Sequence, residues 1–240
     1  MSRLDTEQQR LFSTDEHSRS AGLVRRMVLG ISGPADWPLL GAVWRGVQAD
    51  LDLPAPAIAV NGVDAFELWF SVADPLPAET AASFLDRLCD RYLPDLAASR
   101  RRMSPSPDPG LGTEPERVPQ LRAETGRWSA FVAPDLAAVF GDDPSLDIPP
   151  GEDAQADLLS RIRPVTRAEF QIAMARLMPE PSPFLHEPVA AAPLRNAAPI
   201  APRRGPTNGY DDPRQFLLDV MNDATVSMEL RIQAAKALLP

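Results

Sequence analysis

The chain has 240 residues and a formal net charge of −9, with a sequence pI near 4.8. This length suffices for one hydrophobic core with additional segments. The acidic balance argues against bulk attraction to nucleic-acid phosphates, although it does not exclude a local basic patch. Cys89 is the single cysteine, which excludes a disulfide framework or a zinc cluster within one chain.

The first segment, residues 1–20, is polar, and we expect it to be a disordered lead-in. It lacks the apolar stretch of a secretory signal. No apolar run in the sequence reaches the roughly 18 residues needed to cross a bilayer. We therefore expect a cytoplasmic protein with no membrane partner.

The next elements alternate between strand and helix. LVRRMVLGISG (23–33) is rich in strand-forming residues, and LPAPAIAV (53–60) predicts a second strand. Between them, Asp36 is a plausible N-cap for a helix over 36–51. Apolar residues recur there at helical spacing and form one face: Leu39, Leu40, Val43, Trp44 and Val47.

The clearest pattern is a hairpin whose turn begins at Asn61-Gly62, since both residues tolerate positive φ. Alternation then predicts a half-buried strand, with Phe66, Leu68, Phe70 and Val72 on one face and Glu67, Trp69 and Ser71 on the other. A helix follows that ends at Pro94, and its apolar face is Ala81, Phe84, Leu85, Leu88, Cys89 and Tyr92. RRRMSPSP (100–107) predicts a last edge strand.

Residues 21–107 thus have the order β-α-β-β-α-β, which is the ferredoxin-like arrangement. We predict an α+β fold in which two helices cover one face of a four-stranded antiparallel sheet. A Pro/Gly-rich linker is expected over 108–119. Residues 120–178 are expected to form a small α-rich extension that packs on the core, with two helices broken at Pro164.

The C-terminal part has a different composition. Residues 179–209 are rich in Pro, Ala and Arg and predict a disordered tether. Residues 210–240 predict two short amphipathic helices that are too small to bury their apolar stripes alone. These helices are expected to dock on their own core, on another copy or on a protein partner, through Phe216, Leu217, Val220, Met221, Leu230 and Ile232.

The hairpin and its flanks, LDLPAPAIAVNGVDAFELWFSVADPLPAETAASFLDRL, resemble part of the archaeo-eukaryotic primases and primase-polymerases. The resemblance covers residues 23–107. In that family, two acidic residues on the first strand and a third on the last hold divalent metal for nucleotidyl transfer, and a histidine after the turn contacts nucleotide phosphate. Here the first strand, VLGISG, has no carboxylate, the turn has no histidine, and RRRMSPSP has no acid. The resemblance therefore implies a catalytically degenerate member, with no catalytic or metal-binding residue and no cofactor, that still binds nucleic acid or a partner.

The C-terminal segment, DPRQFLLDVMNDATVSMELRIQAAKALLP, resembles a segment of phage terminase small-subunit-like proteins. That resemblance covers about 30 residues. It implies a packaging protein that recruits a partner through its C-terminal helices and forms a ring-like oligomer, whereas a primase-like domain allows a monomer.

Basic residues are the candidates for binding nucleic acid. Arg100, Arg101 and Arg102 form the densest basic run, and Arg25 and Arg26 lie on a strand expected to neighbour it. Together they would form a phosphate-contacting stripe, with Trp69 as a stacking platform for bases. The alternative is a charged edge strand that prevents aggregation.

Other residues that could take part in catalysis or metal binding are better explained by structural roles. Asp50 and Asp52 fall at a predicted helix end, and the acidic stretch GDDPSLDIPPGED (141–153) lacks the spacing of a calcium loop. His17 and His186 lie in segments expected to be disordered. Ser32 and Ser71 have no nucleophile-elbow context.

Two function hypotheses remain from the sequence. The first is a non-enzymatic DNA-metabolism protein of a phage or mobile element, in which a degenerate primase-like domain binds single- or double-stranded DNA or acts as an adaptor. The second is a terminase small-subunit-like packaging protein. An active primase is a third, and it would need carboxylates that the sequence does not place on the expected strands.

Overall fold

A computed structural model describes residues 1–107 and 116–178. The chain divides into two units, Met1–Leu185 and His186–Pro240, and the description below concerns the first. The expected tether (179–209) and helix pair (210–240) lie outside the described residues, as does most of the expected linker. Within the described ranges, no helix is long and apolar enough to cross a membrane.

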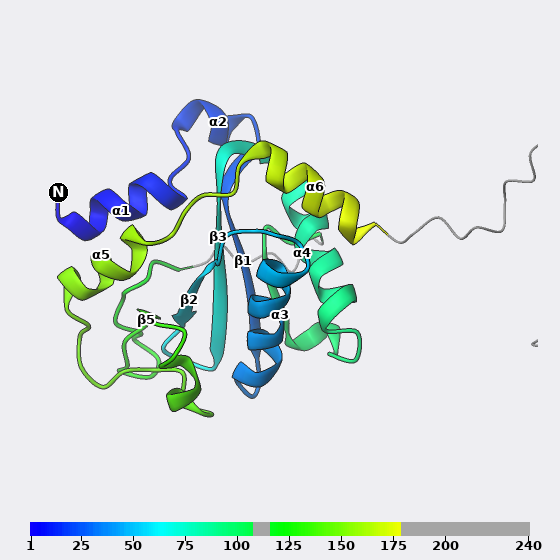
Figure 1. The fold of residues 1–240 in the computed structure, drawn as a ribbon. Helices are drawn as coiled ribbons and strands as arrows, with labels where there is room; N and C mark the ends of the chain where they lie inside the picture. Colours follow the sequence, from blue (N-terminus) through cyan, green and yellow to red (C-terminus); the bar gives the residue numbers. More distant parts are fainter. Residues whose placement is uncertain (108–115, 179–240) are drawn as a thin grey trace, which may run out of the picture. The chain divides into compact units, whose positions relative to one another are not determined.

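The described unit has an α+β fold built on a five-stranded antiparallel sheet (Figure 1). The predicted α+β class is confirmed, and the sheet has five strands where four were expected. The strand order is β4-β1-β3-β2-β5, and every neighbouring pair is antiparallel. In chain order the elements are α1 (Arg3–Phe12), α2 (Glu16–Ser20), β1 (Leu23–Ser32), α3 (Trp37–Ala49), β2 (Ala57–Val60), β3 (Ala65–Pro77), α4 (Ala78–Tyr92), η1 (Ala98–Arg100), β4 (Arg101–Ser104), β5 (Ala130–Val132), η2 (Ala137–Phe140), α5 (Glu152–Ser160) and α6 (Arg167–Leu177).

One face of the sheet packs against α3, α4 and α6 and carries the larger core. Alternate residues of β1, β2 and β3 supply it, as the sequence pattern predicts. The fully buried side chains include Met27, Leu29, Ile31, Phe66, Leu68, Phe70, Phe84, Leu85 and Leu88. Helices α3 and α4 approach closely at Gly46, where a Cβ atom would lie 2.6 Å from Cζ of Tyr92.

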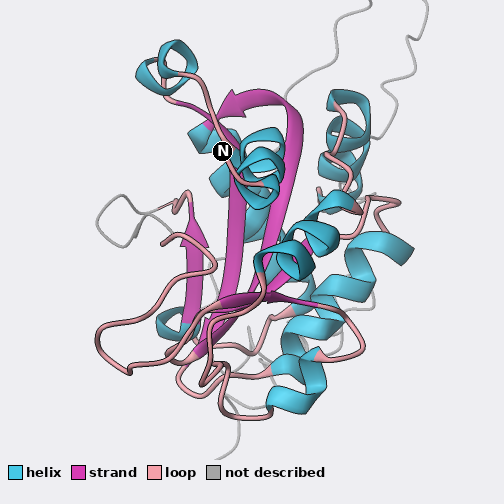
Figure 2. Cartoon of the chain, turned by 90° about the vertical axis from the view of Figure 1, so that its left-hand side faces the viewer, coloured by secondary structure: helices cyan, strands magenta, loops and turns pink. Residues whose placement is uncertain are grey.

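The opposite side, called here the second face, is partly covered by α1 and α5 (Figure 1). The expectation of a disordered lead-in over residues 1–20 is therefore wrong, because α1 buries Leu4, Leu11 and Phe12 against this face. These residues recur on one side of a helix, and Ser2 caps it in a capping box with Asp5. Figure 2 looks toward this face and shows α1, beside the N-terminal label, in front of the long strands.

Polar side chains fix α1 in this position. The buried Ser71 hydroxyl donates to the Leu11 carbonyl oxygen at 2.6 Å. The Arg10 guanidinium donates to the Leu159 and Ile162 carbonyl oxygens at the C-terminal end of α5. The Gln8 amide donates to the Val118 carbonyl oxygen. Val118 is buried, so the end of the segment expected to be a linker is instead packed against α1.

The predicted turn at Asn61-Gly62 is present and is held by the asparagine side chain. The Asn61 Oδ1 atom accepts hydrogen bonds from the backbone N–H groups of Val63, Asp64 and Ala65, each at 2.9 Å. Gly62 has a φ of +80°, a conformation that glycine adopts without strain. The turn places Glu67 and Trp69 on the second face.

The extension over 120–178 adds a strand to the sheet as well as helices. β5 pairs with β2, and the buried Gln155 side chain of α5 hydrogen-bonds the N–H and C=O of Phe131 at 2.7 and 2.9 Å. The amide of Gln155 thus takes the place of a further strand at this edge. At α6, the predicted capping box of Thr166 and Glu169 is present.

Candidate functional site

The second face carries a row of polar side chains between β4 and β3. In the strand register, Gly30 of β1 lies opposite Arg102 of β4 on one side and Glu67 of β3 on the other. Two residues earlier on β1, Val28 lies opposite Trp69. Because side chains alternate along a strand, Arg26 shares this face with them. The structure thus brings together three of the six residues expected to bind nucleic acid, namely Arg26, Trp69 and Arg102.

Trp69 is not an open stacking platform, as the sequence led us to expect. Its side chain is 3% exposed, because the rings of Phe12 and Phe131 meet it edge-on at centroid distances of 5.2 and 5.5 Å. The guanidinium of Arg26 lies over the indole at 5.3 Å from the ring centroid, within the range of a cation–π interaction. Phe12 belongs to helix α1, which was not predicted.

Glu67 is the acidic member of the row. Its Oε2 atom accepts a hydrogen bond from the indole Nε1 of Trp69 at 2.9 Å. Burial raises the pKa of the Glu67 carboxyl, while the Trp69 hydrogen bond and the positive charges of Arg122, Arg102 and Arg26 act in the opposite direction. A carboxyl with a raised pKa among arginines is typical of functional sites and also of structural ion-pair networks.

Gly30 leaves the space in which the Glu67 and Arg102 side chains lie. A Cβ atom at this position would be 3.3 Å from Cγ of Glu67 and 3.5 Å from Cβ of Arg102. Arg102 contacts Asp64 at 3.2 Å, and its side chain is 53% exposed. The Arg102 guanidinium is therefore accessible from solvent beside the Glu67 carboxyl.

The other three predicted arginines have mainly structural contacts. Arg100 donates to the Ser32 and Pro34 carbonyl oxygens at 3.1 and 2.8 Å. Arg101 lies on the helical side and donates to the Leu96 and Leu93 carbonyl oxygens. Arg25 lies at a register shift in β1 and donates to the Ala73 carbonyl oxygen at 2.8 Å. The continuous basic stripe expected from the sequence is therefore wrong, since these guanidinium groups fix loops and strand ends.

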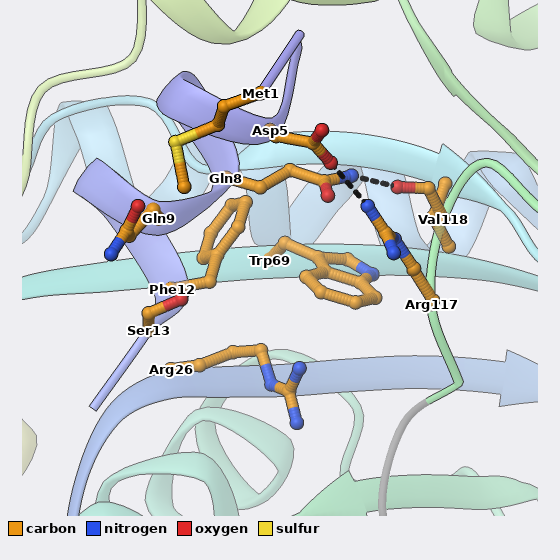
Figure 3. A pocket seen from close by; sticks show the side chains of 10 residues that line it. All are labelled: Met1, Asp5, Gln8, Gln9, Phe12, Ser13, Arg26, Trp69, Arg117 and Val118. Atoms are coloured by element: carbon orange, nitrogen blue, oxygen red, sulfur yellow. Dashed lines mark hydrogen bonds and ion pairs between the residues drawn. The ribbon is translucent and has the colours of Figure 1, made fainter. Parts of the chain in front are cut away.

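A cavity of about 520 Å³ opens on the second face beside α1. Figure 3 shows Phe12 and Trp69 at its centre, Arg26 below them and Arg117 at the side. Arg117 forms an ion pair with Asp5 of α1. The remaining lining residues are Met1, Gln8, Gln9, Ser13 and Val118. Aromatic rings, guanidinium groups and side-chain amides thus line one cavity, a combination suited to a planar ligand with an anionic group.

Sequence reasoning missed four contributors to this site, namely Phe12, Glu67, Arg117 and Arg122. Strand alternation already placed Glu67 on the same face as Trp69, so an acid within the apolar run AFELWF (65–70) was the available signal. The Arg122 side chain is buried, and its Nε donates to the Asn61 carbonyl oxygen at 2.6 Å. Its role depends on a contact between residues 61 apart in the chain, which the sequence pattern does not indicate.

The acidic residues that the sequence assigned to a helix end and a loop make local contacts. Asp50 accepts a hydrogen bond from the Tyr92 hydroxyl at 3.0 Å, and Asp143 and Asp147 pair with Arg127. Over the part of the chain that the structure describes, no group of three or more His, Cys, Asp and Glu side chains is arranged to hold a metal ion. His17 lies in α2 and not in a disordered segment.

Comparison of the chain with protein-family models and with curated proteins finds no match.

Proposed function

We propose that the second face of the sheet binds nucleic acid. The observation that carries the proposal is the placement of Arg26 over Trp69 in a cavity whose rim also carries Arg117. Guanidinium groups pair with phosphate oxygens, and the buried Trp69 ring fixes the position of the Arg26 guanidinium. Arg102 extends the basic surface to the neighbouring strand.

We further infer that β1, α3, β2, β3, α4 and β4 form a ferredoxin-like unit. The order β4-β1-β3-β2 with antiparallel neighbours and two helices on one face supports this assignment. In this arrangement the face opposite the helices is available for a ligand. Here α1 and α5 cover one part of it and leave the Arg26 and Arg102 side accessible.

The proposed role is that of a non-enzymatic module or adaptor in DNA metabolism, with a degenerate primase-like domain. The sequence of β1, β2 and β4 supports it, because these strands contain no Asp or Glu. Residues 211–240 are proposed to bind a protein partner, on sequence grounds alone. The alternative packaging role predicts a ring-like oligomer, so sedimentation of the full chain distinguishes the two.

The test is fluorescence anisotropy of the full chain with labelled single-stranded and duplex DNA at several salt concentrations. Arg26→Gln/Arg102→Gln is expected to weaken binding and to lower the slope of log affinity against log salt by about 1 for each lost phosphate contact. The matched control is Arg45→Gln/Arg87→Gln, because both residues lie on helices of the opposite side. Equal weakening by both pairs, or no binding by the native chain at low salt, would contradict the proposal.

A further inference from the structure

Another cavity, of about 430 Å³, lies on the face of the sheet that packs against the helices, and it has no part in the proposed function. It forms where the end of β3 meets the first turn of α4 and one side of α6. Figure 1 shows α6 beside α4 in this region. Small-molecule sites typically enclose about 300–1,000 Å³, so the cavity has the size of a small-ligand site.

The floor and one wall of this cavity are apolar. Val72 and Val165 are buried and form a parallel bridge between β3 and the segment before α6. The backbone N–H groups of Ala73 and Val165 donate to carbonyl oxygens within this pairing, each at 2.8 Å. Pro75 and Pro77 have no N–H group, so this wall offers a ligand mainly apolar contact. The other apolar lining residues are Leu76, Phe170 and Met174.

The rim of the cavity carries one acid, one base and two neutral polar residues, namely Asp74, Arg167, Thr80 and Gln171. Over the part of the chain that the structure describes, none of these four side chains makes a hydrogen bond or an ion pair. Polar groups that surround an apolar pocket are typical of ligand sites, where they fix the orientation of the bound molecule.

The two charged residues of the rim occupy corresponding positions on two parallel segments. Asp74 and Arg167 each lie two residues beyond the Val72–Val165 bridge. α6 begins at Arg167, whereas β3 continues to Pro77, and within the described ranges the two charges are not paired with each other. An anionic ligand would therefore meet the Asp74 carboxylate, and a cationic ligand would meet the Arg167 guanidinium. A ligand with one charge of each sign satisfies both groups.

We propose that this cavity binds small apolar zwitterions, the chemical class of apolar amino acids and dipeptides. The apolar side chains of the ligand lie on the floor, its carboxylate pairs with Arg167, and its ammonium group pairs with Asp74. Thr80 and Gln171 supply hydrogen bonds to the polar part of the ligand. The inference is independent of the proposed nucleic-acid function, because the cavity lies on the opposite face of the sheet from Arg26 and Arg102.

The first experiment is calorimetric titration of the full chain with free leucine, leucyl-leucine, the N-acetyl and C-terminal amide derivatives of leucyl-leucine, and glycyl-glycine. Each blocked derivative is expected to bind about 2- to 5-fold more weakly than leucyl-leucine, as the loss of one solvent-exposed ion pair predicts. Glycyl-glycine is expected to bind at least ~100-fold more weakly, because each buried CH₂ group contributes a factor of about 4. Tighter binding by leucine or by leucyl-leucine identifies amino acids or dipeptides as the ligand, and either result supports the proposal.

Variants of the two charged residues assign each ligand group to its partner. In Arg167→Gln, leucyl-leucine and its amide are expected to bind equally, because the partner of the carboxylate is absent. In Asp74→Asn, leucyl-leucine and its N-acetyl derivative are expected to bind equally. Asp153→Asn and Arg161→Gln are the matched controls, since both residues are exposed at α5, outside the cavity lining, and they should leave all affinities unchanged.

A third variant tests whether the ligand occupies the cavity. Gln171 is exposed at the rim, so Gln171→Trp is expected to fold normally and to fill the opening with its indole ring. Thermal melts check the fold, and leucyl-leucine is expected to lose its binding.

Three results would overturn the proposal. The first is that neither leucine nor leucyl-leucine binds the full chain at concentrations up to ~10 mM. The second is that leucyl-leucine binds the native chain no more tightly than both of its blocked derivatives. The third is that a folded Gln171→Trp binds leucyl-leucine as tightly as the native chain does. None of these results bears on DNA binding, which is tested with the Arg26 and Arg102 variants.

Discussion

Gly46 in α3 faces Tyr92 of α4 with no room for a side chain. A Cβ atom there would lie 2.6 Å from Cζ of the ring, and the Tyr92 hydroxyl is held by Asp50. We expect Gly46→Ala to lower the free energy of unfolding by about 1–3 kcal/mol, because the Tyr92 ring or one of the two helices must shift. Urea denaturation measures this loss.

Gly41 provides the control within the same helix. A Cβ at Gly41 would lie 3.3 Å from Cε2 of Trp37, a contact that a small side-chain movement relieves. Alanine also favours a helix over glycine by about 1 kcal/mol. Gly41→Ala is therefore expected to be neutral or stabilising, and an equal loss in both variants would show that helix contact at Gly46 is not the cause.

Glu67 also makes the stability of the fold depend on pH. Burial raises the pKa of this carboxyl in the folded chain above its ordinary value of 4.5, so ionisation favours the unfolded chain. Stability from this group is therefore fully present below pH 4.5 and is lost as pH rises through the raised pKa. Glu67→Gln is expected to be more stable than the native chain at pH 8 and to approach it at pH 4. Urea titrations across this range test the sign, and an advantage that grows toward low pH would refute it.

At the scale of elements, helix α1 covers part of the second face. Phe12 contacts both Trp69 and Phe131, so its removal leaves a cavity at the end of the helix. Phe12→Ala is expected to cost about 3–5 kcal/mol and to expose Trp69 to quenching by acrylamide. Gln9→Ala, at an exposed position of the same helix, should change neither stability nor quenching by a comparable amount.

The N-terminus of α6 depends on Glu169. Its carboxylate accepts hydrogen bonds from the backbone N–H and hydroxyl of Thr166 and from Arg163, which lowers its pKa to about 2. Because the folded pKa is depressed, its contribution is present above the ordinary value of 4.5 and is lost as pH falls toward 2. Thr166→Ala is expected to cost about 0.5–2 kcal/mol. Glu169→Gln should be destabilising at pH 7, with a deficit that shrinks in acid, as thermal melts at both pH values will measure.

The sequence pattern predicted most elements of the sheet and the two helices α3 and α4, because alternation and helical spacing are local properties. It did not predict α1, although Leu4, Leu11 and Phe12 have the spacing of one helix face, because polar residues are the majority over residues 1–20 and a short apolar face is hard to recognise among them. β5 has three residues, too few for alternation to be recognised. The prediction for Arg100 and Arg101 differs from the structure because their guanidinium groups bond to carbonyl oxygens, in the case of Arg100 one that is 68 residues away, which is a tertiary property.

At the scale of the described unit, Cys89 reports on cooperative unfolding. Its thiol is fully buried between α4 and the sheet, and burial raises its pKa to about 11, so the reactive thiolate is scarce at pH 8. We expect native Cys89 to react with a disulfide reagent at least ~1,000-fold more slowly than in denaturant, since reaction requires unfolding. The labelling rate should rise with urea as steeply as global unfolding does.

Gly46→Ala distinguishes global unfolding from local opening of α4 as the route by which Cys89 is labelled. If labelling proceeds through global unfolding under fast exchange with the folded state, a loss of 1–3 kcal/mol accelerates it by about 5- to 150-fold. If α4 instead opens locally, the native rate will depend only weakly on urea. Gly41→Ala, which should preserve stability, is expected to leave the rate unchanged or to slow it. A shallow urea dependence would mean that α4 separates from the sheet before the rest of the unit unfolds, and the two faces of the sheet would then be independent in stability.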